Sequence, residues 1–198
     1  MTEQALPAGP AMALKRRAAG VEYFDLYTAD REKTEKIMAR GEPTPEGYYR
    51  LVVHVCIFDS QGRMLIQQRQ PFKSGWSNYW DMSVGGCAVA GDTSIAAAER
   101  ETREEIGLSV DLTGVRPVLT INFERGFDDF YAVNQDVDLS TLRLQPEEVQ
   151  AVRWATLEEI LQMIDDRQFI PYEKGLVSLL FFMRNHRSVE TYRDPTRK

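Results

Sequence analysis

Three glutamates lie close together in the segment RETREEIGL, residues 100–108. If the segment is helical, Glu101, Glu104 and Glu105 occupy positions i, i+3 and i+4 and share one face. Like charges at this spacing repel each other by about 0.2–0.5 kcal/mol per pair, so the face needs solvent, basic neighbours or a bound cation. Arg100 is four residues before Glu104, so a solvated face with ion pairs is the alternative to a cation site.

The residues around this segment favour a helix. Residues 94–106 are rich in Ala and Glu and contain neither Gly nor Pro. Gly107 follows at the position where a glycine commonly ends a helix. The sequence therefore predicts one helix that carries all three glutamates.

The spacing continues upstream of the helix, from Gly86 to Leu108. Five residues separate Gly86 from Asp92, and seven separate Asp92 from Arg100. This pattern resembles the Nudix hydrolase signature, in which Gly, five residues, Glu, seven residues and Arg-Glu are followed by a Glu-Glu pair and a Gly. Asp92 stands where the family has Glu, and Thr102 stands where it has an aliphatic residue. The position of Asp92 is mainly structural in the family, so the resemblance still implies an active enzyme.

The resemblance implies hydrolysis of a diphosphate bond with Mg²⁺, for which Mn²⁺ can substitute. It assigns the Glu104 and Glu105 carboxylates and the Gly86 carbonyl as metal ligands. Glu101 either binds the ion or orients the attacking water. Arg100 is expected to orient the carboxylates. Such a site suits Mg²⁺, because this ion prefers oxygen ligands and keeps substrate phosphates in its shell.

Further catalytic and substrate-binding residues are expected outside the signature. Nudix enzymes often use an additional carboxylate as general base, and of the acids after the helix we favour Asp129 and Glu148. Arg69 ends a predicted strand that points toward the phosphates in the family. Trp80 belongs to an aromatic-rich loop and is a candidate for stacking a base or enclosing an apolar group.

Strand patterns surround the predicted helix. The expected strands are residues 22–27, 34–40, 50–59, 64–70, 81–86, 114–123, 127–133 and 150–154. A capping box from Thr156 to Glu159 opens a second helix. A third helix, in 172–185, is expected to bury Leu176, Leu179, Leu180 and Met183. Strands mixed with a few helices predict an α/β protein, and the resemblance implies an α/β/α sandwich around a mixed β-sheet.

The composition suits one domain, which we place at residues 21–186 with an N-terminal hairpin and flexible tails at 1–20 and 187–198. A net charge of −6 argues against general nucleic-acid binding. The two cysteines do not suggest a disulfide framework. No apolar run approaches the roughly 20 residues of a membrane span, and the N-terminus lacks the order of a signal peptide. We expect a cytoplasmic protein without membrane contact, and the hairpin is compatible with a homodimer.

The segment QQRQPFKSGWSNYWDMSVGG also resembles isopentenyl-diphosphate isomerase, a relative of the Nudix hydrolases. That enzyme needs a cysteine where Gly85 stands, a histidine where Cys87 stands, and further histidine ligands. We therefore expect hydrolysis of a nucleoside diphosphate derivative or a similar small organic diphosphate. A prenyl-diphosphate hydrolase, an isomerase-like enzyme and a ligand-sensing module without turnover are the alternatives.

Overall fold

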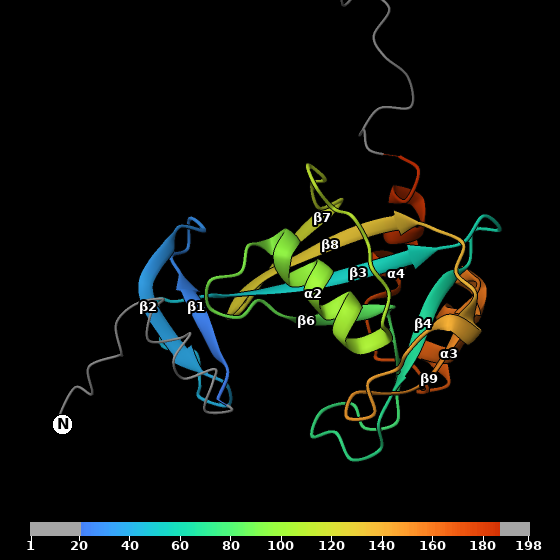
Figure 1. Cartoon of the computed structure of the whole chain (residues 1–198), viewed down its shortest axis with the longest axis horizontal. Coiled ribbons are helices and arrows are strands. Elements are labelled where there is room, and N and C mark those ends of the chain that lie inside the picture. The colour runs from blue at the N-terminus through green and yellow to red at the C-terminus, as the bar shows by residue number, and fades with distance from the viewer. Residues whose placement is uncertain (1–20, 187–198) are drawn as a thin grey trace, which may run out of the picture.

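The computed structural model describes residues 21–186, so the tails predicted for 1–20 and 187–198 lie outside the described residues. A two-stranded hairpin, β1 (Tyr23–Tyr27) and β2 (Lys33–Ala39), stands at one end of the molecule (Figure 1). It confirms the two short N-terminal strands expected from the sequence.

The rest of the chain is organised around a seven-stranded sheet. Its strands are β3 (Arg50–Phe58), β4 (Met64–Arg69), β5 (Trp80–Asp81), β6 (Val84–Cys87), β7 (Leu119–Phe123), β8 (Gly126–Asn134) and β9 (Val149–Ala155). Within the described residues β3 and β8 pair in parallel, and the other pairs in this sheet are antiparallel. The predicted mixed sheet is confirmed.

Helices cover both faces of this sheet. Helix α2 (Ser94–Ile106) lies on one face, and α3 (Leu157–Asp165) and α4 (Lys174–Met183) lie on the other (Figure 1). Successive side chains of a strand point to opposite faces. Accordingly Val53 and Val55 of β3 pack in the core beneath α2, whereas Cys56 and Phe58 pack in the core beneath α3 and α4. The α/β/α sandwich is therefore as expected.

Strands β3 and β4 separate soon after their hairpin. They pair only at Phe58 and Met64, while β6 pairs with β3 from Val52 to Val55. Ser83 holds the two strands at the point of separation, because its hydroxyl accepts from the Ile57 N–H at 2.9 Å and donates to the Leu65 carbonyl at 2.6 Å. The predicted strand 81–86 is consequently divided into β5 and β6. Cys87 is the last residue of β6.

Helix α4 presents a different face to the core from the one predicted. Its buried residues are Val177, Leu180 and Phe181, and Leu179 is 39% exposed. The helix is apolar nearly all round, so its sequence pattern did not identify one buried face. None of the described helices has the length and apolar character needed to cross a membrane.

Candidate active site

Helix α2 begins and ends where the sequence predicted. The Thr93 side chain caps its N-terminus by accepting from the Ala96 N–H, and Gly107 ends it with a φ of 70°. The helix directs the three glutamates toward β6. Glu101 and Glu105 are buried, whereas the Glu104 side chain is 48% exposed.

The Glu101 carboxyl group lies directly against Gly86 of β6. A Cβ atom on Gly86 would lie 2.3 Å from Cδ of Glu101 and 2.4 and 2.7 Å from its two carboxylate oxygens. Real Cβ contacts essentially never come closer than 3.0 Å. Glycine is therefore required here to let a carboxylate of the helix reach the backbone of the strand.

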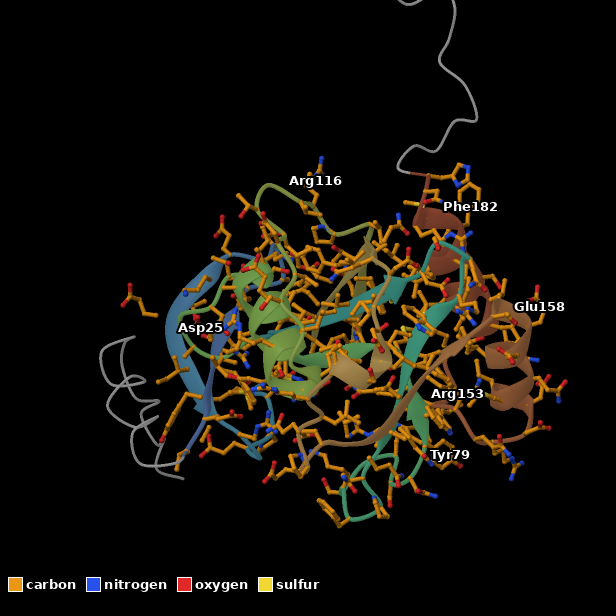
Figure 2. The ribbon with its side chains drawn as sticks, turned by 45° about the vertical axis from the view of Figure 1, so that its right-hand side comes forward. Asp25, Tyr79, Arg116, Arg153, Glu158 and Phe182 are labelled. Carbon is orange, nitrogen blue, oxygen red and sulfur yellow. The ribbon has the colours of Figure 1, made fainter. Side chains whose placement is uncertain are left out.

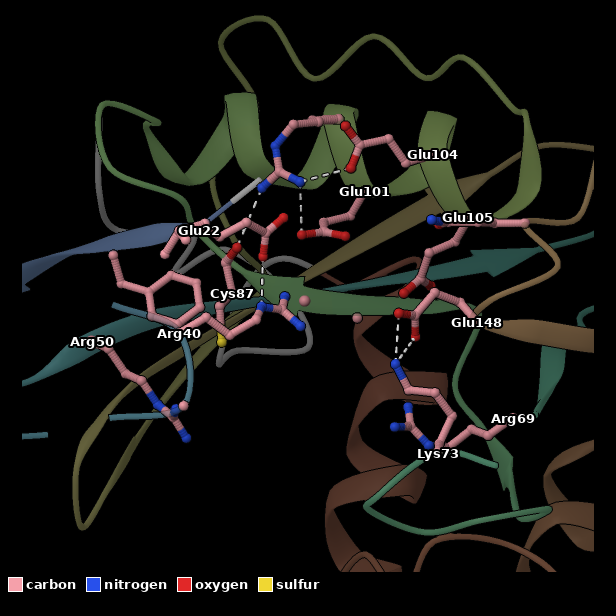
Figure 3. Close-up of a pocket in the computed structure, with 17 residues that line it drawn as sticks. Glu22, Arg40, Arg50, Arg69, Lys73, Cys87, Glu101, Glu104, Glu105 and Glu148 are labelled. Atoms are coloured by element: carbon pink, nitrogen blue, oxygen red, sulfur yellow. Dashed lines mark hydrogen bonds and ion pairs between the residues drawn. The ribbon is translucent and has the colours of Figure 1, made fainter. Parts of the chain in front are cut away.

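Arg100 holds the carboxylates together (Figure 3). Its Nη1 donates to Glu101 at 2.9 Å and to Glu104 at 3.0 Å, and its Nε donates to Asp92 at 3.0 Å. Burial alone would lower the pKa of Arg100, but Glu101 and Asp92 more than offset it, so the pKa is raised and the guanidinium stays charged. This geometry matches the orienting role expected for Arg100. It also shows that the shorter Asp92 still reaches this arginine.

Glu105 is the most deeply buried of the three acids. Gln67 donates to its carboxylate at 2.9 Å. Burial raises the pKa of Glu105 to about 8, and the charges of Glu101 and Glu148 add to the effect. Burial also raises the pKa of Glu101, although Arg100 opposes this. A pKa of about 8 leaves Glu105 protonated at neutral pH. A cation at these carboxylates would relieve their mutual repulsion and release the proton from Glu105.

The donor set fits a hard divalent cation. Within residues 21–186 no group of three His, Cys, Asp or Glu side chains has the geometry to hold a metal ion. Glu101 and Glu104 accept hydrogen bonds from Arg100. The available atoms are three carboxylates and the backbone carbonyl of Gly86, a residue that lies directly against the Glu101 carboxyl group. All are oxygen donors, which Mg²⁺ prefers.

The carboxylates open into a pocket of about 730 Å³, a volume typical of small-molecule sites. Four separate parts of the chain line it: the hairpin region, the start of β3, β6 with α2, and the segments at the end of β4 and before β9. The lining residues are Val21, Glu22, Phe24, Arg40, Gly41, Arg50, Arg69, Lys73, Gly85, Gly86, Cys87, Arg100, Glu101, Glu104, Glu105, Gln145 and Glu148. The pocket is thus dominated by charged side chains of both signs.

The predicted residues Arg69 and Glu148 both line this pocket. Glu148 forms an ion pair with Lys73 at 2.5 Å. The Arg69 Nε donates to the carbonyl of Gly75 at 3.1 Å. Sequence reasoning did not identify Lys73 as a site residue, because only the fold brings residues 73 and 148 together.

Two predicted site residues lie outside the pocket lining. Asp129 is fully buried and accepts from the hydroxyls of Ser94 at 2.5 Å and Thr120 at 2.6 Å, and it pairs with Arg31 of the β1–β2 turn. These contacts join the hairpin to the start of α2, so they fit a structural role and not that of a general base.

Trp80 is the other. Its ring lies beneath the guanidinium of Arg153, whose carbon is 5.2 Å from the ring centroid, and packs with the core under α3 and α4. That position does not suit the substrate contact that we expected.

Comparison with known proteins identifies the family. Residues 48–173 match the model of the NUDIX domain. The chain belongs to the Nudix family. An uncharacterized Nudix hydrolase of Listeria innocua is 46% identical over 165 residues, which cover 83% of this chain and 96% of that protein. A crystal structure from Deinococcus radiodurans superposes with a TM-score of 0.64 at 26% identity and covers 80% of this chain and 97% of that one.

The predicted class of enzyme, a hydrolase of diphosphate bonds, is confirmed at the level of this family. The resemblance to the isomerases also reappears. An isopentenyl-diphosphate isomerase of Citrobacter koseri is 30% identical over 128 residues, covering 61% of this chain and 70% of that protein. Here Gly85 lies directly over the His54 ring, because a Cβ on Gly85 would be 2.7 Å from it. A cysteine at this position would therefore require the His54 ring to move.

Proposed function

We propose that this Nudix protein hydrolyses the diphosphate bond of a nucleoside diphosphate derivative or a similar small organic diphosphate, in a Mg²⁺-dependent reaction. The contact between the Glu101 carboxylate and Gly86 is the observation that carries the proposal. It brings the backbone of β6 against a cluster of carboxylates at the wall of a pocket large enough for a nucleotide.

The residues have separate roles in this proposal. Gly86, Glu101, Glu104 and Glu105 hold Mg²⁺, or Mn²⁺ in its place. An ion held there would supply positive charge to the phosphate oxygens and would lower the pKa of a bound water. Arg100 keeps Glu101 and Glu104 aligned through its two hydrogen bonds.

Glu148 is our candidate for the general base. It lies in the pocket with its side chain 26% exposed, and it takes the proton of the attacking water while Lys73 fixes its orientation.

The character of the pocket favours a polar substrate over a prenyl diphosphate. Among residues 21–186, Val21 and Phe24 are its only large apolar lining residues, and Phe24 is itself buried in the core beneath the hairpin. Binding of a prenyl chain is favourable when its apolar surface is buried against an extended apolar lining. The same charged lining is what a nucleotide, with its phosphates and polar base, requires. A cytoplasmic location and a homodimer formed through the hairpin remain predictions from the sequence.

A substrate panel tests the proposal. Release of phosphate or pyrophosphate products is measured for nucleoside di- and triphosphates, nucleotide sugars, dinucleotides and prenyl diphosphates, each with Mg²⁺, with Mn²⁺ and with EDTA. We expect metal-dependent hydrolysis of at least one nucleotide class and none with EDTA. Hydrolysis restricted to prenyl diphosphates would overturn the substrate assignment. Binding of nucleotides without any turnover would favour the ligand-sensing alternative.

A further inference from the structure

Arg50 is a charged side chain with an unused hydrogen-bonding group. It is the first residue of β3, and its Nε is buried without a hydrogen-bond partner among the described residues. Buried donors are nearly always paired, and a charged donor without a partner is costly. Arg50 also lines the pocket that contains the carboxylates. Because no hydrogen bond or ion pair of its guanidinium is present among the described residues, Arg50 is a candidate to bind a ligand in the pocket.

The strand register places Arg50 on the other side of β6 from the carboxylates. Val53 of β3 pairs with Gly86, which contacts Glu101, whereas Val52 pairs with Cys87. Side chains alternate along a strand, so Arg50 shares the face of Val52 and not that of Val53. Figure 3 shows the same arrangement, with the α2 glutamates on one side of the β6 ribbon and Arg50 on the other. The pocket thus extends around this strand.

The other pocket cations already have acidic partners. Each lies within 4 Å of a carboxylate, in the pairs Arg40–Glu22, Lys73–Glu148, Arg69–Asp81 and Arg100–Glu101. Within residues 21–186 no such ion pair involves Arg50. Arg40 lines the same pocket, but its guanidinium is already paired with Glu22.

We propose that Arg50 binds a second anionic group of the substrate. This rests on the proposed function: the cleaved diphosphate lies on the carboxylate side of β6, and a further phosphate of the same substrate lies on the Arg50 side. Arginine suits this task, because its planar guanidinium binds phosphate oxygens through parallel hydrogen bonds. The preferred substrates are therefore diphosphates that carry an additional phosphate.

The anion site is tested first without hydrolysis. Binding of inorganic phosphate and pyrophosphate is measured by calorimetry in EDTA for the unaltered protein, Arg50→Gln, Arg50→Lys and Arg116→Gln. Arg116 is exposed on the loop between α2 and β7, outside the pocket lining, and controls for the loss of one charge (Figure 2). We expect Arg50→Gln to weaken binding about 10- to 100-fold, Arg50→Lys to weaken it less, and Arg116→Gln to leave it unchanged. Equal affinities in all four proteins, or no binding in any, would overturn the anion site.

Matched substrates then test specificity with Mg²⁺ present. NADPH exceeds NADH by one phosphate, and coenzyme A exceeds its dephospho form by one phosphate. We expect the unaltered protein to have the higher kcat/KM for the phosphorylated member of at least one pair, through a lower KM. The preference is the ratio of kcat/KM for the phosphorylated member to kcat/KM for its unphosphorylated counterpart. Arg50→Gln should lower this ratio about tenfold or more, whereas Arg116→Gln should leave it unchanged.

The two proposals fail in different ways. Hydrolysis without any preference for the extra phosphate would refute the role of Arg50 and leave the proposed function standing. Arg50-dependent binding in EDTA without hydrolysis of any diphosphate would refute the proposed function and leave the anion site standing. Thermal unfolding of each variant shows whether it folds. If Arg50→Gln does not fold, the comparison of Arg50→Lys with the unaltered protein still tests the proposal.

Discussion

Replacing Gly86 by alanine should disable the site while leaving the fold intact. The new Cβ would lie 2.3 Å from Cδ of Glu101, compared with about 3.4 Å for ordinary contact, so the carboxyl group has to move by about 1 Å. The group displaced is the far end of a side chain and not backbone, so the protein can accommodate the change. A displacement of about 1 Å in a reacting constellation can cost about a hundredfold in rate.

The assay compares Gly86→Ala with Gly175→Ala, since a Cβ at Gly175 meets nothing within 4 Å. For each protein kcat/KM is measured on the best substrate of the panel, over a titration of Mg²⁺, together with the thermal midpoint. We expect Gly86→Ala to lose about a hundredfold in kcat/KM and to require more Mg²⁺. Gly175→Ala should retain full activity.

A double variant shows whether Glu101 mediates the effect. Aspartate is one methylene shorter, so Glu101→Asp withdraws the carboxylate from the new methyl group. Adding Glu101→Asp to Gly86→Ala should therefore cost less than the sum of the two single changes. Wild-type turnover and Mg²⁺ dependence in Gly86→Ala would refute the reasoning, because the Glu101–Gly86 contact would then have no part in catalysis.

Three further predictions follow from the placement of the other acids. Asp129→Asn should lower the free energy of unfolding by about 2–3 kcal/mol in urea titrations, while kcat of the folded protein changes less than about tenfold; a larger fall in kcat at unchanged stability would restore Asp129 as general base. Glu148→Gln should lower kcat about 10²- to 10⁴-fold, and the exposed neighbour variant Glu147→Gln should not; equal rates for both would exclude Glu148 as the base. In EDTA, native Glu105, with a pKa raised from 4.5 to about 8, holds a proton that the unfolded chain has lost, so the free energy of unfolding should fall as pH rises from 5 to 8. Glu105→Gln should flatten that dependence, which urea titrations at pH 5, 7 and 9 measure. The same pH dependence in Glu105→Gln as in the unaltered protein would contradict the role of Glu105.

Local patterns made the glutamate helix predictable. Its bounds depend on neighbours in sequence, such as the Thr93 cap and Gly107. The same holds for α3, where both hydrogen bonds of the Thr156–Glu159 capping box form. These features need no information about distant parts of the chain.

Contacts between distant segments could not be predicted in the same way. Asp129 lies in β8, but its partner Arg31 is 98 residues away in sequence, and this pairing gives it a structural environment. Likewise Lys73 reaches Glu148 across 75 residues. The position of Arg50 on the opposite side of β6 depends on the register between β3 and β6. Sequence spacing gave the proposed metal ligands and Arg69, whereas the other cationic residues outside the signature, such as Lys73 and Arg50, were associated with the pocket only by the fold.

The most direct test of the account is Mg²⁺-dependent turnover by Glu104→Gln. The control is Glu158→Gln, which removes the same charge from the exposed surface of α3 (Figure 2). We predict that Glu104→Gln loses about a hundredfold or more in turnover with an unchanged thermal midpoint, while Glu158→Gln matches the unaltered protein. Full Mg²⁺-dependent turnover in Glu104→Gln would contradict the claim that the α2 carboxylates hold the catalytic ion.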